Sequence, residues 1–140
     1  MIHLILFKQN NEEKAKAIED ALAASFSQFS PLVLRSIPDL KARLVKTMPY
    51  KDAEIYVLIA DTKDCLRKCF SLEKVLSDKR LILIIPDGKK STLTLAHGLR
   101  PRFVFCSRDN PENLCAVISK MIQNFKSDPC VKDLKKRVKA

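Results

Sequence analysis

The chain has very little glycine and few aromatic residues. Of its 140 residues only 2 are glycine, 6% are aromatic, and none is tryptophan. A glycine-rich loop that cradles phosphate needs several glycines close together, so most loops of that kind are excluded. The scarcity of aromatic rings argues against a carbohydrate-binding platform. The sequence thus lacks the simplest signatures of phosphate-loop and sugar-binding proteins.

A long apolar segment is also missing. The N-terminal apolar stretch runs from Ile2 and ends at Lys8, which is too short for a signal peptide or a membrane span. The 5 cysteines are odd in number, and most lie in apolar or helical contexts, which favours reduced thiols over a disulfide framework. We therefore expect a cytoplasmic protein that makes no use of a membrane.

Acidic residues are outnumbered by basic ones. The 26 Lys plus Arg against 16 Asp plus Glu leave a formal charge of +10. With 46% hydrophobic and 30% charged residues, the chain is expected to fold around one hydrophobic core. The charge favours an anionic partner without identifying one.

Short apolar segments alternate with amphipathic ones. The apolar segments have little polar alternation, which is typical of strands buried on both faces of a parallel sheet. The predicted strands are 2–7, 32–35, 54–60, 81–86 and 102–106. Five helices are predicted between and after them: after Asn11, from Pro38, after Thr62, over 89–99 with Gly98 marking its end, and after Asp109.

This alternation predicts an α/β fold with a doubly wound, five-stranded parallel sheet. At this length the flavodoxin-like strand order 2-1-3-4-5 is expected, with a site at the carboxyl ends of strands one and three. The expected domain spans residues 1–125, and residues 126–140 form a basic C-terminal tail. Its basic side chains are Lys132, Lys135, Lys136, Arg137 and Lys139.

Two adjoining segments resemble the receiver domains of response regulators. Gly98-Leu99-Arg100-Pro101-Arg102-Phe103-Val104-Phe105 is similar to the approach to their last strand. Asn110-Pro111-Glu112-Asn113-Leu114 is similar to the start of their last helix. With the five β-α units, the resemblance covers about the first 125 residues. It implies a receiver-like fold in a bacterial-type signalling system.

The residues that perform phosphorylation in receivers are largely absent. The family carries two acidic residues after strand one to hold Mg²⁺, and the matching residues here are Lys8, Gln9 and Asn10. Asp61 matches the phosphoacceptor, although a role as a helix cap beside Thr62 is favoured over phosphorylation. The other two family positions correspond to about Pro86 and to Cys106. The resemblance therefore implies a pseudo-receiver that is not phosphorylated.

No set of residues in the sequence has the spacing of a metal site or of a catalytic triad. Cys65 and Cys69 share a helical face, but no further ligand lies at zinc-finger spacing, so we expect core packing. We therefore expect no metal, no cofactor and no enzymatic activity.

Three functions remain open. The first is protein binding or homodimerisation, without catalysis. The resemblance places that contact on the fourth helix, fifth strand and fifth helix, at Thr94, His97, Arg102, Phe105 and Lys120. The second is binding of a small anionic ligand at the strand ends by Lys8, Lys63, Lys89 and Arg108. The third is nucleic-acid binding through the tail, which has no aromatic residues among its lysines for base stacking.

Overall fold

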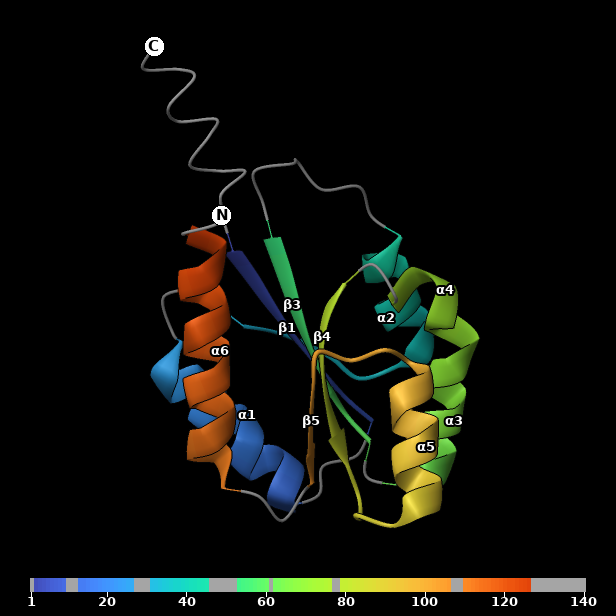
Figure 1. Ribbon diagram of the computed structural model, residues 1–140. Coiled ribbons are helices and arrows are strands. Elements are labelled where there is room, and N and C mark those ends of the chain that lie inside the picture. Colours follow the sequence, from blue (N-terminus) through green and yellow to red (C-terminus); the bar gives the residue numbers. More distant parts are fainter. Residues whose placement is uncertain are drawn as a thin grey trace.

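Five parallel strands form one sheet in the order β2-β1-β3-β4-β5 (Figure 1). The computed structural model of the chain describes residues 2–9, 13–26, 31–45, 53–60, 62–76, 79–106 and 110–126. This strand order confirms the predicted doubly wound fold. The strands are β1 (Ile2–Lys8), β2 (Leu32–Leu34), β3 (Ala53–Ile59), β4 (Arg80–Ile85) and β5 (Phe103–Cys106).

Helices cover both faces of the sheet. In Figure 1 one group of helices lies on one side of the sheet and a second group lies on the opposite side. The first pair is α1 (Glu13–Ser25) and α6 (Pro111–Lys126). The second group is α2 (Ile37–Leu44), α3 (Lys63–Cys69), α4 (Glu73–Leu76) and α5 (Lys90–Gly98).

The third predicted helix is interrupted. A 3₁₀ turn at Phe70–Leu72 separates α3 from α4. The Ser71 hydroxyl donates a 2.7 Å hydrogen bond to the Lys68 carbonyl oxygen, which gives the backbone an alternative partner at this point. The sequence predicts an apolar stripe along this helix at Cys65, Leu66, Cys69, Leu72, Val75 and Leu76. All of these residues are buried except Val75, which is half-buried.

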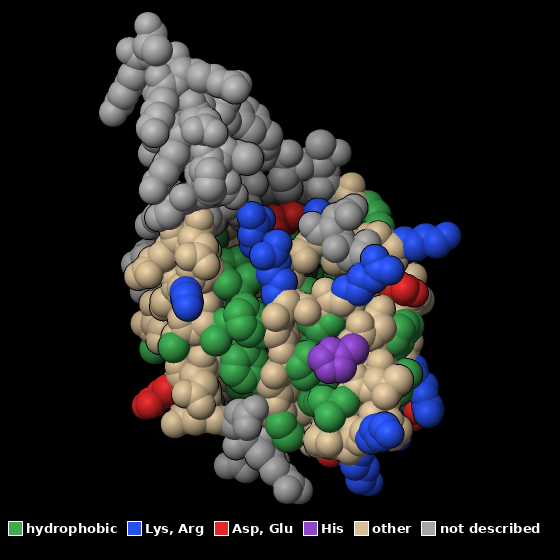
Figure 2. All heavy atoms as spheres, viewed as in Figure 1, with side chains coloured by type: hydrophobic (Ala, Val, Ile, Leu, Met, Phe, Trp, Pro, Cys, Tyr) green, Lys and Arg blue, Asp and Glu red, His purple; other side chains and the backbone are tan. Residues whose placement is uncertain are grey.

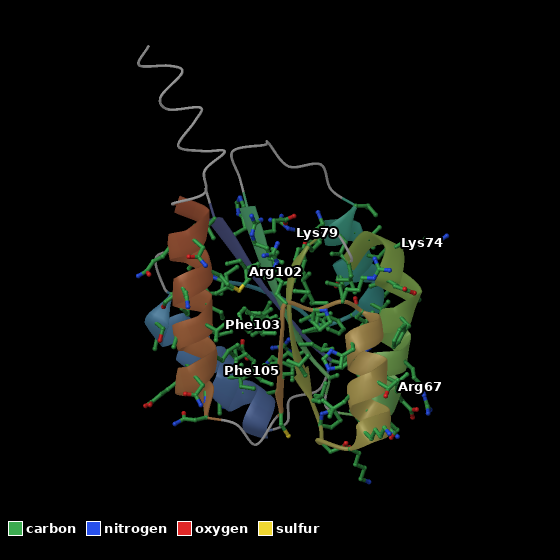
Figure 3. The ribbon with its side chains drawn as sticks, in the orientation of Figure 1. Arg67, Lys74, Lys79, Arg102, Phe103 and Phe105 are labelled. Carbon is green, nitrogen blue, oxygen red and sulfur yellow. The ribbon has the colours of Figure 1, made fainter. Side chains whose placement is uncertain are left out.

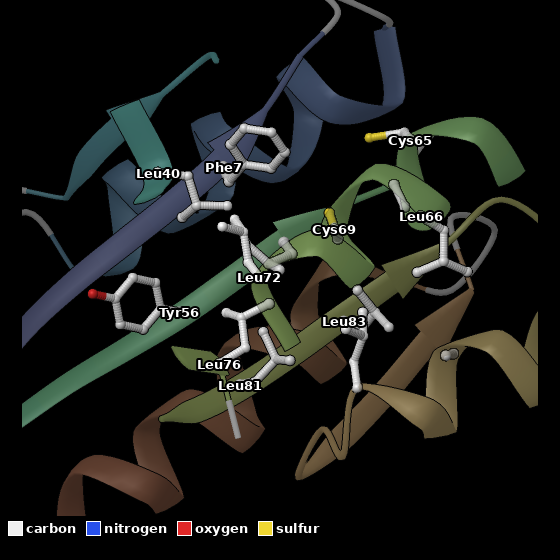
Figure 4. Packing of buried hydrophobic residues seen from close by; sticks show 14 of the residues in the cluster. Phe7, Leu40, Tyr56, Cys65, Leu66, Cys69, Leu72, Leu76, Leu81 and Leu83 are labelled. Carbon is white, nitrogen blue, oxygen red and sulfur yellow. The ribbon is translucent and has the colours of Figure 1, made fainter. Parts of the chain in front are cut away.

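The core consists of two layers that follow from the alternation of side chains along each strand. Leu4 and Leu6 of β1 face α1 and α6, whereas Ile5 and Phe7 face the other helices. Figure 4 shows residues of the second layer, among them Tyr56, Cys69 and Leu81. Because both layers are apolar, the central strands need apolar residues through their middle parts, as 4–7, 55–59 and 81–85 have.

Side chains satisfy the first amide groups of several helices. Ser36 accepts a hydrogen bond from the Asp39 amide at the start of α2, and Thr62 accepts one from the Cys65 amide at the start of α3. At α6, the side-chain oxygen of Asn110 accepts from the Glu112 amide at 3.0 Å. These caps turn the chain from a strand end into the next helix.

Candidate functional site

The carboxyl end of β1 carries a buried lysine. The side chain of Lys8 is 3% exposed and forms an ion pair with Glu19 of α1. Lys8 continues the series Leu4 and Leu6, so its side chain lies on the α1 side of the sheet. In the sequence, Lys8, Gln9 and Asn10 match the segment that carries acidic residues in receivers. The structure shows that Lys8, the first of the three, is a cation whose charge is already paired within the protein.

The end of β4 is marked by an aspartate. Asp87 accepts a 2.9 Å hydrogen bond from the Lys89 amide. The hydroxyl of the fully buried Thr92 lies beside the Asp87 carboxylate without completing a hydrogen bond of ordinary geometry. That hydroxyl is the largest cause that lowers the pKa of Asp87; the Lys89 amide and the ammonium groups of Lys89 and Lys63 add to it.

Two of the cations predicted to bind an anionic ligand have partners within the described part of the chain. Lys8 pairs with Glu19, and the Lys63 ammonium donates a 2.6 Å hydrogen bond to the Ser91 hydroxyl. Lys63 and Lys89 both act on the Asp87 carboxylate, so an anion there would meet a negative charge. Arg108 lies outside the described residues, as does Asp61.

A polar hollow of about 650 Å³ lies at the ends of β1, β2 and β3. Its basic residues are Arg35 and Lys68, and the carboxylate of Asp64 lines it as well. Asp64 also forms a 3.4 Å ion pair with the exposed Arg67. The hollow therefore contains charges of both signs. The remaining lining residues are Gln9, Ser36, Ile37, Pro38, Thr62 and Cys65.

The residues proposed for partner contact lie on α5, β5 and α6. Thr94, His97, Arg102 and Lys120 are exposed, whereas Phe105 is half-buried and packs against the α1 and α6 layer. The Thr94 hydroxyl donates to the Lys90 carbonyl oxygen at 2.9 Å. We call these three elements together the β5 face.

The β5 face carries an apolar strip that the sequence analysis did not single out. Phe103 is 42% exposed, which is unusual for a large apolar side chain in this molecule. Figure 3 shows Phe103 and Phe105 pointing from β5 toward α6, with Arg102 beside them. In Figure 2 hydrophobic atoms run along the strand between the two helices, with basic side chains at one end. Because side chains alternate between the two faces of a strand, Phe103 and Phe105 lie on the same face. This spacing in the sequence could have indicated the apolar strip.

An open hollow of about 510 Å³ lies along the β5 face. Apolar residues of α5 and β5, among them Leu93 and Val104, line it together with His97 and Arg102. The others are Ile85, Gly88, Pro101, Phe103 and Cys106. The β5 face is thus hollowed, largely apolar, and bordered by cations.

A buried carboxylate lies at the opposite end of the sheet. Glu54 accepts a 2.9 Å hydrogen bond from Arg43 and lies 3.6 Å from the Lys79 ammonium. Burial raises the pKa of the neighbouring Tyr56 well above its usual value, and the negative charge of Glu54 adds to the effect. Two basic side chains neutralise the buried carboxylate, so we interpret the cluster as structural.

The helical thiols are in the core. Cys65 and Cys69 are 3% and 0% exposed. The pKa of Cys69 is raised by its hydrogen bond with Cys65 and by burial. Among the residues that the structure describes, no three His, Cys, Asp or Glu side chains are placed to hold a metal ion.

Within the described ranges, no helix has both the length and the apolar composition needed to cross a bilayer. The tail residues Lys132, Lys135, Lys136, Arg137 and Lys139 lie outside those ranges.

Comparison with known proteins gives a structural match. No protein-family model matches the sequence, and no curated protein matches it. Among solved structures, a response regulator from Thermotoga maritima superposes with a TM-score of 0.57 at 8% sequence identity. The match covers 88% of this chain and 99% of that one. At so low an identity the likeness concerns the fold alone, and the chain has a receiver-like fold.

Proposed function

We propose that the chain is a non-catalytic, receiver-like module of a bacterial-type signalling system, which binds another protein in the cytoplasm and is not phosphorylated. The observation that carries the proposal is the end of β1, where receivers supply carboxylates and this chain supplies Lys8, paired with Glu19. Magnesium requires hard oxygen ligands, and an ammonium group at a ligand position offers none.

The loss of the metal ligands removes the reason to expect phosphoryl transfer. The charge that develops on a transferred phosphoryl group must be neutralised by a metal ion and by cations. Asp61 would have neither the carboxylates after β1 nor a lysine at the end of β5, where the sequence has Cys106. What remains of a receiver is its fold and its surfaces.

The β5 face supports protein binding. It combines exposed apolar area at Phe103 with exposed polar and basic side chains at Thr94, His97, Arg102 and Lys120. An apolar centre with a polar border is the usual anatomy of a protein interface. A small anionic ligand is less favoured, because Asp87 and Asp64 lie among the available cations.

Phosphorylation can be tested directly. The protein is incubated with Mg²⁺ and acetyl phosphate or phosphoramidate and then weighed by intact-mass spectrometry, next to a receiver that keeps the full acidic set. We expect no phosphoryl adduct on this chain. An adduct that disappears in the Asp61→Asn variant would contradict the proposal.

Partner binding is tested with immobilised protein and an extract of the native cells. A protein that is retained by the wild type and by Arg67→Glu, but not by Arg102→Glu, would support the β5 face. Arg67 is the matched control because it is an exposed arginine of α3, far from β5 in Figure 3. Equal retention by the two variants would contradict the choice of face.

A further inference from the structure

The edge of the sheet at β5 offers little opportunity for main-chain pairing. The Ala60 amide donates a 2.8 Å hydrogen bond to the Ile84 carbonyl oxygen, so the backbone groups of Ile84 face β3. With this orientation, the register of β4 and β5 turns the amide and carbonyl groups of Phe103 and Phe105 toward β4. An occupant whose backbone hydrogen bonds are internal, as in an α-helix, therefore suits this edge better than an added strand.

The segments that build the β5 face are almost free of acid. Residues 88–106 and 110–126 contain one acidic residue, Glu112, and six basic residues. Glu112 lies in the first turn of α6, which follows β5 in the chain, whereas Arg100 and Arg102 precede β5 and are both exposed. The six basic residues are Lys89, Lys90, Arg100, Arg102, Lys120 and Lys126. This charge distribution favours a negatively charged occupant, above all near the start of β5.

Apolar surface is available on both sides of β5. The side chain of Phe103 is 42% exposed and points toward α6 (Figure 3). On the side of α5, Leu93 and Val104 line the hollow of about 510 Å³, together with Arg102. A helix that lies along β5 can place the apolar side chains of one face on both surfaces.

We propose that the partner of this chain contributes an acidic, amphipathic α-helix that lies along β5 between α5 and α6. The proposal rests on the proposed function and specifies the chemistry of the partner on that same face. Apolar side chains of the helix, three and four residues apart, contact Phe103 and the hollow, and its carboxylates face Arg100 and Arg102. Arginine and aromatic side chains are among those that most often dominate the binding energy of a protein interface.

Two other occupants fit less well. A second copy of the chain would bring the same basic face against itself, and like charges repel. A nucleic acid would match the charge of Arg100 and Arg102, but its polar sugar-phosphate backbone would leave the apolar hollow unfilled. An acidic helix with an apolar face matches both the charge and the apolar surface.

The test uses the full chain and a synthetic probe. The probe is a peptide of about 16 residues, blocked at both ends, because shorter helices are marginal in water. It carries Leu or Phe at helical spacing on one face, Glu beside them and Ala elsewhere. Its controls are the same peptide with Lys for every Glu, a peptide of the same composition with the apolar residues at alternate positions, and a single-stranded oligouridine. Binding is followed by the amide chemical shifts of the chain, and circular dichroism measures helix content.

We expect the acidic amphipathic peptide to shift the amide resonances of Leu93, Phe103 and Val104 and to gain helix content when it binds. The lysine peptide and the peptide with redistributed apolar residues should bind about fivefold more weakly or less, because each lacks one of the two matching features. Arg102→Glu should weaken binding of the acidic peptide about fivefold and strengthen binding of the lysine peptide, whereas Arg67→Glu should leave both within about twofold.

The apolar contact has a matched control on the other edge of the sheet. Leu32 of β2 is also 42% exposed, and β2 is the edge strand opposite β5. Phe103→Ala should weaken binding of the acidic peptide about fivefold, whereas Leu32→Ala should leave it within about twofold. Urea unfolding verifies that both variants fold. If Phe103→Ala does not fold, the peptide with redistributed apolar residues tests the same contact from the side of the partner.

Four results would overturn the inference: no binding of the acidic peptide, binding without a gain of helix or without shifts on the β5 face, displacement of the peptide by oligouridine, or concentration-dependent shifts of β5 in the chain alone, which would indicate a second copy. If a cellular protein is still retained through Arg102 while the peptide fails, the partner does not contribute an acidic helix, yet the proposed function stands. If no cellular protein is retained and the peptide also fails, both are contradicted.

Discussion

At the scale of single residues, Lys8 is the most informative position in the molecule. A lysine that is 3% exposed loses its hydration and requires a close negative partner, which Glu19 provides. Glu19 is 27% exposed, so its carboxylate can still contact water. The buried ammonium group therefore needs its partner more than the partly exposed carboxylate does.

This asymmetry predicts that Glu19→Gln destabilises the fold more than Lys8→Met. Removing the carboxylate leaves a buried ammonium unpaired and should cost about 3 kcal/mol. Removing the ammonium leaves a carboxylate that can hydrate, and methionine fills similar volume, so the cost should be about 1 kcal/mol. The free energy of unfolding in urea measures both.

Asp20→Asn is the control, because Asp20 is the exposed neighbour of Glu19 on α1 and should change the free energy of unfolding by less than about 0.5 kcal/mol. If Glu19→Gln and Lys8→Met changed the free energy of unfolding equally, the unequal burial of the two side chains would not affect stability, which would contradict the prediction.

At the scale of elements, the end of α5 shows why its last residue is glycine. Gly98 is the last residue of α5, as predicted, but the residue with left-handed backbone is Arg100, with a φ of 54°. A Cβ atom at position 98 would lie 2.7 Å from the ring of Phe70. The close approach of the Phe70 ring therefore favours glycine at this position.

The contact predicts that Gly98→Ala is destabilising by about 1–2 kcal/mol, although alanine is the better helix former by about 1 kcal/mol. In a Phe70→Leu background, where the side chain is shorter, the same substitution should become neutral or stabilising. Urea unfolding of the four proteins in this cycle measures the coupling. An identical effect of Gly98→Ala in both backgrounds would contradict the explanation.

At the scale of the whole molecule, the charge of +10 is unevenly distributed. Residues 126–140 contain six basic and two acidic residues, so +4 of the total belongs to this segment and +6 to residues 1–125. On the folded domain, residues 88–106 contain no acid at all. The larger part of the positive charge thus lies in the C-terminal segment and on the β5 face, which are separable by truncation.

We predict that nucleic-acid binding by this chain is weak, independent of sequence and dependent on the tail. Truncation after residue 126 should abolish the gel shift of an oligonucleotide. For the full chain, a plot of the logarithm of the binding constant against the logarithm of the salt concentration should have a slope no steeper than about −5, because five basic side chains lie beyond residue 126. A shift that survives both truncation and high salt would contradict this. An unchanged urea unfolding transition of the truncated chain is the control for an intact domain.

Much of the architecture follows from local pattern. Segments such as Tyr56-Val57-Leu58-Ile59 are apolar at every position, and only a strand covered on both faces can bury all of them. The 3₁₀ turn after Cys69 was not predictable, because the apolar stripe keeps the same spacing through it.

The candidate site was predictable only in part. Arg102 and Phe105 were placed correctly on β5 and its approach, but the exposure of Phe103 depends on what lies next to an edge strand. Likewise, Lys8 was expected among the cations at the strand ends, whereas its side chain lies against α1. A sequence specifies that side chains alternate between two faces, but not which helix covers each face.

The sequence by itself therefore determined the parallel sheet, its two apolar layers and the loss of carboxylates after β1, because burial and metal chemistry depend on residue type and local order. Only the tertiary structure decided that Lys8 is neutralised by Glu19, eleven residues later in the chain, and that Phe103 and its cationic neighbours lie exposed on the same face. Those outcomes depend on which elements become neighbours in space.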